Sequence, residues 1–319
     1  MVKLYWGVFI LNNITTSCEY VSSNSKHVSI NLEKLNSLVE SIKDIKMEHW
    51  LSSSPFGLLD LPVETIINFL LVYEAIDFSF WGIPKWCIDT EYGNLDGSIA
   101  LLYEILKYVK ENKTTDFSTI EKDEFENILK GNIQIPLFEE RFRIIKKVSQ
   151  IVNDKMNDNF YKYIKKINSD YELFELIVNN FPNFKDERIY NGQTIYIYKL
   201  AQLLTSDILH IREMKENIDI DYSHLIGCAD YKIPQVLRAM GILVFDDELS
   251  KLVDSQTELP INSEYEVEIR ANMLTVINII NKQLDDKFDR IDINDYLFMK
   301  KKDKTLALKP YHLTRCTNY

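Results

Sequence analysis

The sequence predicts a mainly α-helical protein that forms a single domain over residues 1–319, with one short β-hairpin near residues 187–198. Along most of the chain, hydrophobic residues recur at spacings of three and four, which puts them on one face of a helix. Only one segment carries a strong strand signal. No internal repeat, Pro- or Gly-rich linker or low-complexity tract divides the chain, and a chain of this length can bury a substantial core.

Helical periodicity begins after an apolar N-terminal stretch. Residues 4–11 are an apolar run of eight behind a single basic residue, Lys3. We expect a buried N-terminal element there and not a cleaved signal, because the basic segment of a signal is almost missing. The amphipathic helical pattern then appears in five segments, residues 32–45, 99–109, 137–151, 173–177 and 271–284. No run approaches the ~18 apolar residues of a membrane span, so no membrane association is expected.

The strand signal surrounds Asn191-Gly192. Residues suited to strands flank this pair, and both Asn and Gly tolerate the positive φ of a primed hairpin turn. We expect a two-stranded ribbon that leads into a helix beginning near Lys199. Pro234 is placed to open a later helix and Gly241 to end it. The lysine-rich residues 300–304 are expected to form a solvated loop and not a binding patch.

Composition excludes several function classes. The chain has 37 basic and 48 acidic residues, a net charge of −11, whereas tight binding to tRNA or DNA normally needs a basic face. We therefore expect no direct nucleic-acid binding, although a small anionic ligand is compatible with a few local cations. The four cysteines are scattered, which suits a reducing cytoplasm. No glycine-rich phosphate or dinucleotide motif and no histidine pair with metal-ligand spacing occurs, so neither a cofactor nor a metal is expected.

Asp207 is the first candidate for chemistry. On the helix predicted from Lys199, three of its four neighbours at helical spacing are apolar, and the fourth is His210. A carboxylate in an apolar stripe is costly to bury unless it is paired or neutralised. It is either a structural acid bonded to a helix end or to His210, or a catalytic carboxylate in a perturbed environment.

Aromatic residues crowd residues 77–86 around Asp77. Phe78, Phe80, Trp81 and Trp86 could be core residues, which is the simpler interpretation, or a slot that stacks on a heterocycle.

Three further sets of polar residues stand near helix ends or the chain end. Asp230 and Tyr231 precede the helix at Pro234, where an Asp usually caps the helix and where anions can also bind. Glu268 and Arg270 could form an ordinary ion pair or contact a ligand. His312 and Arg315 lie close to the end of the chain, where segments are often frayed.

Taken together, these segments resemble the queuosine salvage protein family. The resemblance runs from about residue 18 to residue 319, and its strength lies in the order and spacing of many segments. They are SNSKHV at 23–28, DFSFWG at 77–82, IPLFEERFRII at 135–145, NNFPNFKDERIYNG at 179–192, YKLAQLLTSD at 198–207, ADYKIPQVL at 229–237, YEVEIRA at 265–271 and HLTRC at 312–316. The family is similar in fold to helical DNA glycosylases. It releases queuine from queuosine 5′-monophosphate, and less well from the nucleoside, for re-insertion into tRNA.

The resemblance implies a role for each candidate residue. Asp207 would be the catalytic carboxylate that stabilises a ribosyl cation-like transition state. A 7-deazaguanine has carbon at position 7 and cannot be protonated there, so acids would bind other polar edges of the base. The substrate-binding candidates are Asp77, Phe78, Trp81, Asp230, Tyr231 and Glu268 for base and ribose, and Lys199, Arg270, His312 and Arg315 for the phosphate.

Two other function classes stay open on the sequence alone. A non-catalytic nucleotide- or RNA-binding helical module would use the same aromatic residues without needing Asp207. A helical scaffold would use every singled-out residue structurally and bind no small molecule. Release of free queuine separates the enzyme from both.

Overall fold

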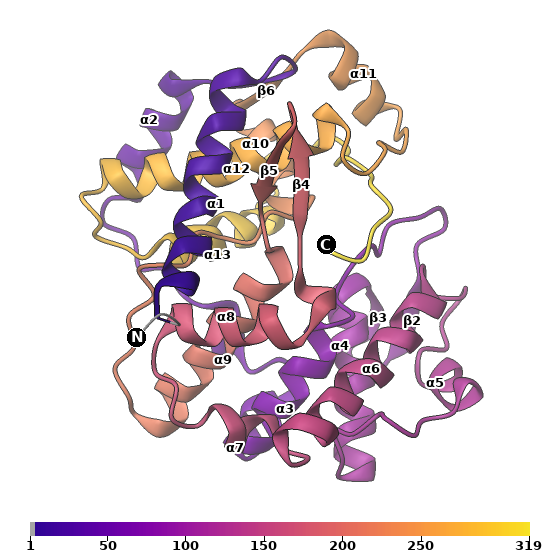
Figure 1. Ribbon diagram of the computed structural model, residues 1–319. Coiled ribbons are helices and arrows are strands. Elements are labelled where there is room, and N and C mark those ends of the chain that lie inside the picture. The colour runs from indigo at the N-terminus through magenta and orange to yellow at the C-terminus, as the bar shows by residue number, and fades with distance from the viewer. Residues whose placement is uncertain (1–3) are drawn as a thin grey trace.

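Helices dominate the structure, a computed structural model that describes residues 4–319 (Figure 1). Residues 1–3, which include Lys3, lie outside the described residues. The α-helices are α1 Leu4–Asn24, α2 Leu32–Ile42, α3 Val63–Glu74, α4 Gly97–Asn112, α5 Lys122–Ile128, α6 Phe138–Met156, α7 Phe160–Ile164, α8 Asp170–Asn180, α9 Lys199–Glu216, α10 Lys232–Ala239, α11 Asp247–Asp254, α12 Glu264–Gln283 and α13 Arg290–Met299. The short 3-10 helices are η1 Trp50–Ser53, η2 Pro55–Asp60, η3 Pro182–Phe184 and η4 Lys300–Lys302. The predicted mainly α class is confirmed.

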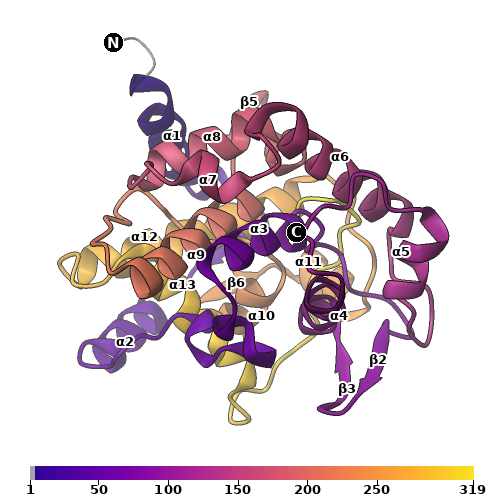
Figure 2. The same ribbon diagram turned by 90° about the horizontal axis from the view of Figure 1, so that it is seen from below.

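The helices pack in two groups that meet at α8 and α9. Helix α1 lies along α12 and also contacts α8, whereas α3 packs on α9 (Figures 1 and 2). In α1, Leu11, Ile14, Cys18 and Val21 are buried at helical spacing. Of residues 4–11, where a buried element is predicted, only Leu11 is described in its burial, and the side chains of residues 4–10 lie outside the described residues. One cluster of buried apolar residues extends from Leu11 to Leu297, so α1 and α13 share a core. Within residues 4–319, no helix has both the length and the apolar character needed to cross a membrane.

The predicted hairpin is present. Strands β4 Glu187–Tyr190 and β5 Gln193–Tyr196 pair antiparallel, and Asn191 and Gly192 have φ values of 49° and 77°. Both turn residues therefore lie in the left-handed region that a primed turn requires. The ribbon leads directly into α9, which begins at Lys199 as predicted.

Two further strand pairs were not predicted. Strand β1 Val28–Ile30 pairs with β6 Leu243–Phe245, and β2 Cys87–Thr90 pairs with β3 Gly93–Asp96, both antiparallel. These strands have three or four residues each, too few to show an alternating pattern.

Two predicted helix starts were too late in the sequence. Helix α10 begins at Lys232, so Pro234 occupies its first turn, and Gly241 ends it with a φ of 73°. Helix α12 begins at Glu264, seven residues before the apolar pattern at 271–284 and a few residues before Glu268 and Arg270, which were expected at the start of a helix. Its first two turns carry charged residues that are buried, and these interrupt the apolar periodicity on which the prediction relied.

A buried arginine fixes the segment that follows α3. Arg141 of α6 is 0% exposed and donates to the carbonyl oxygens of Pro136, Ile76 and Phe78. Its guanidinium also lies over the rings of Phe78 and Phe80, 4.4 and 4.6 Å from their centroids. A single side chain thus satisfies backbone groups that no helix or strand would satisfy.

Replacing Arg141 with Met should reduce the free energy of unfolding by about 2–4 kcal/mol, because buried carbonyl oxygens lose their donors. Urea denaturation measures the change. Arg143→Met is the matched control, since Arg143 is exposed on the same helix and should change stability by less than about 0.5 kcal/mol. Equal effects of the two substitutions would contradict the role given to Arg141.

Candidate active site

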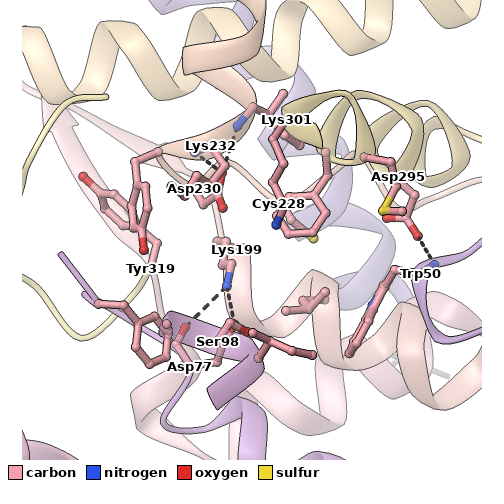
Figure 3. A pocket seen from close by; sticks show the side chains of 18 of the residues that line it. Trp50, Asp77, Ser98, Lys199, Cys228, Asp230, Lys232, Asp295, Lys301 and Tyr319 are labelled. Carbon is pink, nitrogen blue, oxygen red and sulfur yellow. Dashed lines mark hydrogen bonds and ion pairs between the residues drawn. The ribbon is translucent and has the colours of Figure 1, made fainter. Parts of the chain in front are cut away.

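A cavity of about 420 Å³ lies where α3, α9, α10 and α13 end or begin (Figure 3). Its volume is within the range typical of small-molecule sites. Aromatic rings form much of its wall, namely Trp50, Tyr73, Phe78, Phe80, Tyr231, Phe298, Tyr311 and Tyr319. Its charged lining residues are Asp77, Lys85, Asp96, Lys199, Asp230, Lys232, Asp295, Lys301 and Lys302. The last two fall in residues 300–304, where a solvated loop was expected; Lys302 is exposed, whereas Lys301 is partly buried at the cavity wall.

Five of the predicted site residues line this cavity: Asp77, Phe78, Lys199, Asp230 and Tyr231. Asp77 and Phe78 follow α3, whereas Lys199 opens α9. The Lys199 Nζ lies 3.1 Å from Asp77 Oδ2, and both side chains are buried. Burial disfavours the ammonium, but the nearby Asp77 and Asp230 carboxylates together with Cys228 outweigh this effect and raise the pKa of Lys199.

Asp230 caps a helix and also lines the cavity. Its Oδ1 accepts hydrogen bonds from the backbone N–H groups of Lys232 and Ile233, at 2.7 and 3.2 Å. The structural role expected for an Asp before a helix is therefore present. The neighbouring Tyr231 ring lies 4.7 Å from that of Tyr311, centroid to centroid.

Trp81 and Arg315 are not among the cavity-lining residues. The Arg315 guanidinium lies 4.3 Å from the centroid of Trp81, and its Nε is 3.3 Å from a carboxylate oxygen of Glu258. Trp81 packs in a small buried cluster with Tyr231 and Tyr319, which do line the cavity. The pair therefore supports the aromatic wall from behind.

Arg270 and His312 also lie behind the wall. Arg270 is fully buried, with its guanidinium 3.9 Å from the ring centroid of Tyr319. His312 Nε2 lies 3.4 Å from the Tyr319 hydroxyl. Burial and the nearby Arg270 charge lower the pKa of His312 to about 3, so this imidazole is neutral at physiological pH and supplies no cation.

Glu268 serves another part of the fold. Its carboxylate accepts hydrogen bonds from the backbone N–H groups of Lys26, His27 and Val28, at 2.8–3.0 Å, and from the Tyr190 hydroxyl. It fixes the start of β1 and does not pair with Arg270, two residues along the helix. Glu268 is not among the residues that line the cavity, and its role in substrate binding stays a prediction.

Asp207 is 0% exposed and lies one layer behind the cavity. The Trp50 Nε1–H donates to both of its carboxylate oxygens, at 3.1 Å, and Trp50 itself lines the cavity. His49 Nε2 lies 3.2 Å from Asp207 Oδ1. His210 does not bond to Asp207 but stacks on His49 with ring centroids 3.8 Å apart. In this conformation Trp50 separates Asp207 from the cavity.

Two more acids adjoin Asp207 and were missed by sequence reasoning. Glu74 is 0% exposed, and among the described residues no donor hydrogen-bonds to its carboxyl oxygens. Burial and the Asp207 charge raise the pKa of Glu74 well above its usual value, so it is a neutral acid that can donate to Asp207. Asp295 lines the cavity, and burial raises its pKa to about 6.

A family model described as queuosine salvage protein matches residues 60–319. The chain belongs to this family. A protein of Sphaerobacter thermophilus is 31% identical over 265 residues, covering 80% of this chain and 82% of the relative. One from Mus musculus is 26% identical, covering 95% and 97%, and one from Dictyostelium discoideum is 25% identical, covering 86% and 87%. All three are named queuosine 5′-phosphate N-glycosylase/hydrolase.

In this family member, the segment matched by the family model includes Asp207, Glu74 and Asp295, whereas Trp50 and His49 precede it. The arrangement combines aromatic surfaces for a flat heterocycle with several acids and several cations. Such a cavity can bind an anionic nucleotide and place a carboxylate near its sugar.

Glu74→Gln should alter how stability depends on pH. An unfolded glutamate loses its proton near pH 4.3, whereas the folded protein holds the Glu74 proton to higher pH. The stability contributed by the neutral acid is therefore complete below the unfolded pKa and declines as pH rises. Glutamine has no such proton to lose. As the pH rises, the free energy of unfolding of the variant should therefore increase relative to that of the wild type by up to about 1.4 kcal/mol per pH unit.

Urea denaturation of both proteins at pH 5, 6, 7 and 8 measures this difference. The pH 5 values are the internal control, since both side chains are then mainly neutral in the folded state. A difference that stays constant from pH 5 to pH 8 would show that Glu74 is not held neutral.

Proposed function

We propose that this protein hydrolyses the N-glycosidic bond of queuosine 5′-monophosphate and releases queuine and ribose 5-phosphate. The observation that carries the proposal is the group of acids formed by Glu74, Asp207 and Asp295 at one side of an aromatic cavity. Family membership supports it, since relatives that match most of the chain bear the name of this activity. That name does not favour a binding module without catalysis.

Asp207 is the catalytic carboxylate of this proposal. As the bond between C1′ and the base nitrogen breaks, positive charge develops on the ribose, and a carboxylate in a dry site stabilises it strongly. Trp50 covers Asp207 and must move aside for the ribose to reach it. Substrate hydroxyl groups then replace the indole N–H as donors to the carboxylate.

The leaving base needs a proton or hydrogen bonds at positions other than 7. Asp77 and Asp230 line the cavity as acceptors for N–H groups of the base, and Phe78 and Tyr231 offer ring faces. Asp295 also lines the cavity, and its pKa of about 6 suits a group that delivers a proton near neutral pH. Water adds its hydroxyl group to C1′, and its remaining proton replaces the one that Asp295 gives to the departing base nitrogen, so that the hydrolysis balances.

The proposed substrate is a free nucleotide in the cytoplasm. All four cysteines are free thiols, as expected for a reducing compartment. The net charge of −11 opposes approach of a polyanion at long range.

Asp207→Asn should reduce kcat for queuosine 5′-monophosphate at least about 1000-fold, because the amide keeps the shape of the side chain but loses the charge that stabilises the ribosyl cation. Chromatographic detection of queuine measures turnover. Asp219→Asn is the matched control, since Asp219 is exposed just beyond α9 and should retain full activity.

Asp295→Asn distinguishes the two acids nearest Trp50. If Asp207→Asn retains turnover within a few fold while Asp295→Asn abolishes it, Asp295 is the catalytic carboxylate and our assignment is wrong. If the wild-type protein releases no queuine, the proposed function itself fails.

Intact tRNA that contains queuosine should not be a substrate. The acidic chain repels the tRNA backbone, and the base in tRNA carries phosphodiesters on both sides where the nucleotide has one phosphomonoester. Incubation of such a tRNA with the enzyme, followed by nucleoside analysis, tests this, and release of queuine at a rate close to that from the nucleotide would refute it.

A further inference from the structure

Three lysines on the cavity wall, Lys232, Lys301 and Lys302, have no carboxylate partner among the described residues; Lys302 is exposed, whereas the other two are partly buried. Lys232 begins α10 and Lys301 lies in η4, and among residues 4–319 no carboxylate oxygen forms an ion pair with the Nζ of either. By contrast, Lys199 and Lys85 on the same wall pair with aspartates at 3.1 and 3.6 Å. Partly buried cations without counterions usually mark a site for an anion.

Aromatic rings hold both ammonium groups at the wall. The Lys232 Nζ lies 4.1 Å from the ring centroid of Tyr311, and the Lys301 Nζ lies 3.3 Å from that of Phe298. Cation–π contacts of this kind orient a charged group without neutralising it. The two lysines therefore keep their donors free for a ligand.

Burial lowers the pKa of each lysine to about 8. Each has both aspartates and lysines in its surroundings. Asp230 and Asp96 oppose the lowering at Lys232, where Lys85 adds to it.

Around Lys301, Asp230 and Asp77 oppose the lowering, whereas Lys232 and Lys302 add to it. The two ammonium groups of Lys232 and Lys301 repel each other, and an anion bound to both would relieve this repulsion.

We propose that Lys232 and Lys301 form a lysine clamp that binds the 5′-phosphomonoester and makes the enzyme prefer the nucleotide to the nucleoside. This inference rests on the proposed function, and it names the cations that hold the phosphate. Two ammonium groups match the charge of a phosphomonoester dianion and offer six N–H donors to its three terminal oxygens.

The clamp and the acids occupy different parts of the cavity. In Figure 3, Lys232 and Lys301 lie along one edge, whereas Trp50 and Asp295 lie to one side and Asp77 lies across from the lysines. When the phosphate of a nucleotide is bound to the clamp, its base and ribose can therefore contact the other walls of the cavity. Arg270, His312 and Arg315 do not line the cavity, and so they are not placed to contact the phosphate.

The clamp gives the substrate preference a defined pH dependence. Both lysines are charged below pH 8 and lose their protons above it, whereas a phosphomonoester is a dianion above about pH 6. The ratio of kcat/KM for queuosine 5′-monophosphate to that for queuosine should therefore be highest between pH 6 and 8 and fall above pH 8.

Steady-state kinetics with both substrates test the clamp. We expect Lys232→Gln and Lys301→Gln each to lower this kcat/KM ratio by about 10- to 100-fold, the effect of losing one charge-assisted contact. Lys304→Gln is the matched control, since Lys304 is exposed two residues beyond η4 and the substitution should leave the ratio unchanged.

Binding of ribose 5-phosphate, measured by calorimetry against ribose, tests the clamp without catalysis. The wild type should bind the phosphorylated sugar more tightly, and the double variant should lose that difference. The clamp is refuted if the substitutions lower turnover of nucleotide and nucleoside equally, or if the double variant still distinguishes the two sugars. If the wild type binds ribose 5-phosphate but cleaves neither substrate, the clamp stands and the proposed function fails.

Discussion

A buried network of four charges holds the walls of the cavity together. Asp186, Arg188, Glu266 and Arg270 are each no more than 3% exposed. Arg270 pairs with Asp186 at 2.5 Å and with Glu266 at 3.0 Å, and Arg188 pairs with the same two acids at 2.9 and 3.0 Å. Each charge thus has two opposite partners, which offsets the desolvation that makes an isolated buried ion so unfavourable.

This network connects elements that are distant in the sequence. Asp186 also accepts from the backbone N–H of Lys199 at 3.2 Å and so fixes the start of α9. Arg270 donates to the carbonyl of Ala229, next to Asp230, and its guanidinium lies under the ring of Tyr319. Arg270 therefore positions three cavity-lining residues without lining the cavity itself. Arg270 lies in the segment YEVEIRA at 265–271, which resembles the family, and this structural role explains its presence there as well as a ligand contact would.

Sequence reasoning worked best where a signal was local. The Asn191-Gly192 turn and the helix from Lys199 follow from backbone preferences of a few residues, and the structure confirms both. Asp207 stood out because its helical neighbours are apolar, and its burial agrees with that pattern. Its neighbour Glu74 was missed because the contact between them is tertiary. Glu74 lies in an almost wholly apolar helix, the same kind of signal, but nothing in the sequence places α3 against α9.

The cations show a second limit of sequence reasoning. Arg270 and His312 stood in segments typical of the family, whereas Lys301 stood in a lysine-rich stretch that suggested a solvated loop. Only tertiary packing brings the ends of α13 and α10 together, which turns part of that stretch into a cavity wall. Five lysines and four aspartates line the cavity, a local excess of positive charge in a chain of net charge −11. An acidic protein can thus accept a small anion, because screening confines the effect of its distant charges to about 8–10 Å, while the nearest groups to the ligand are lysines.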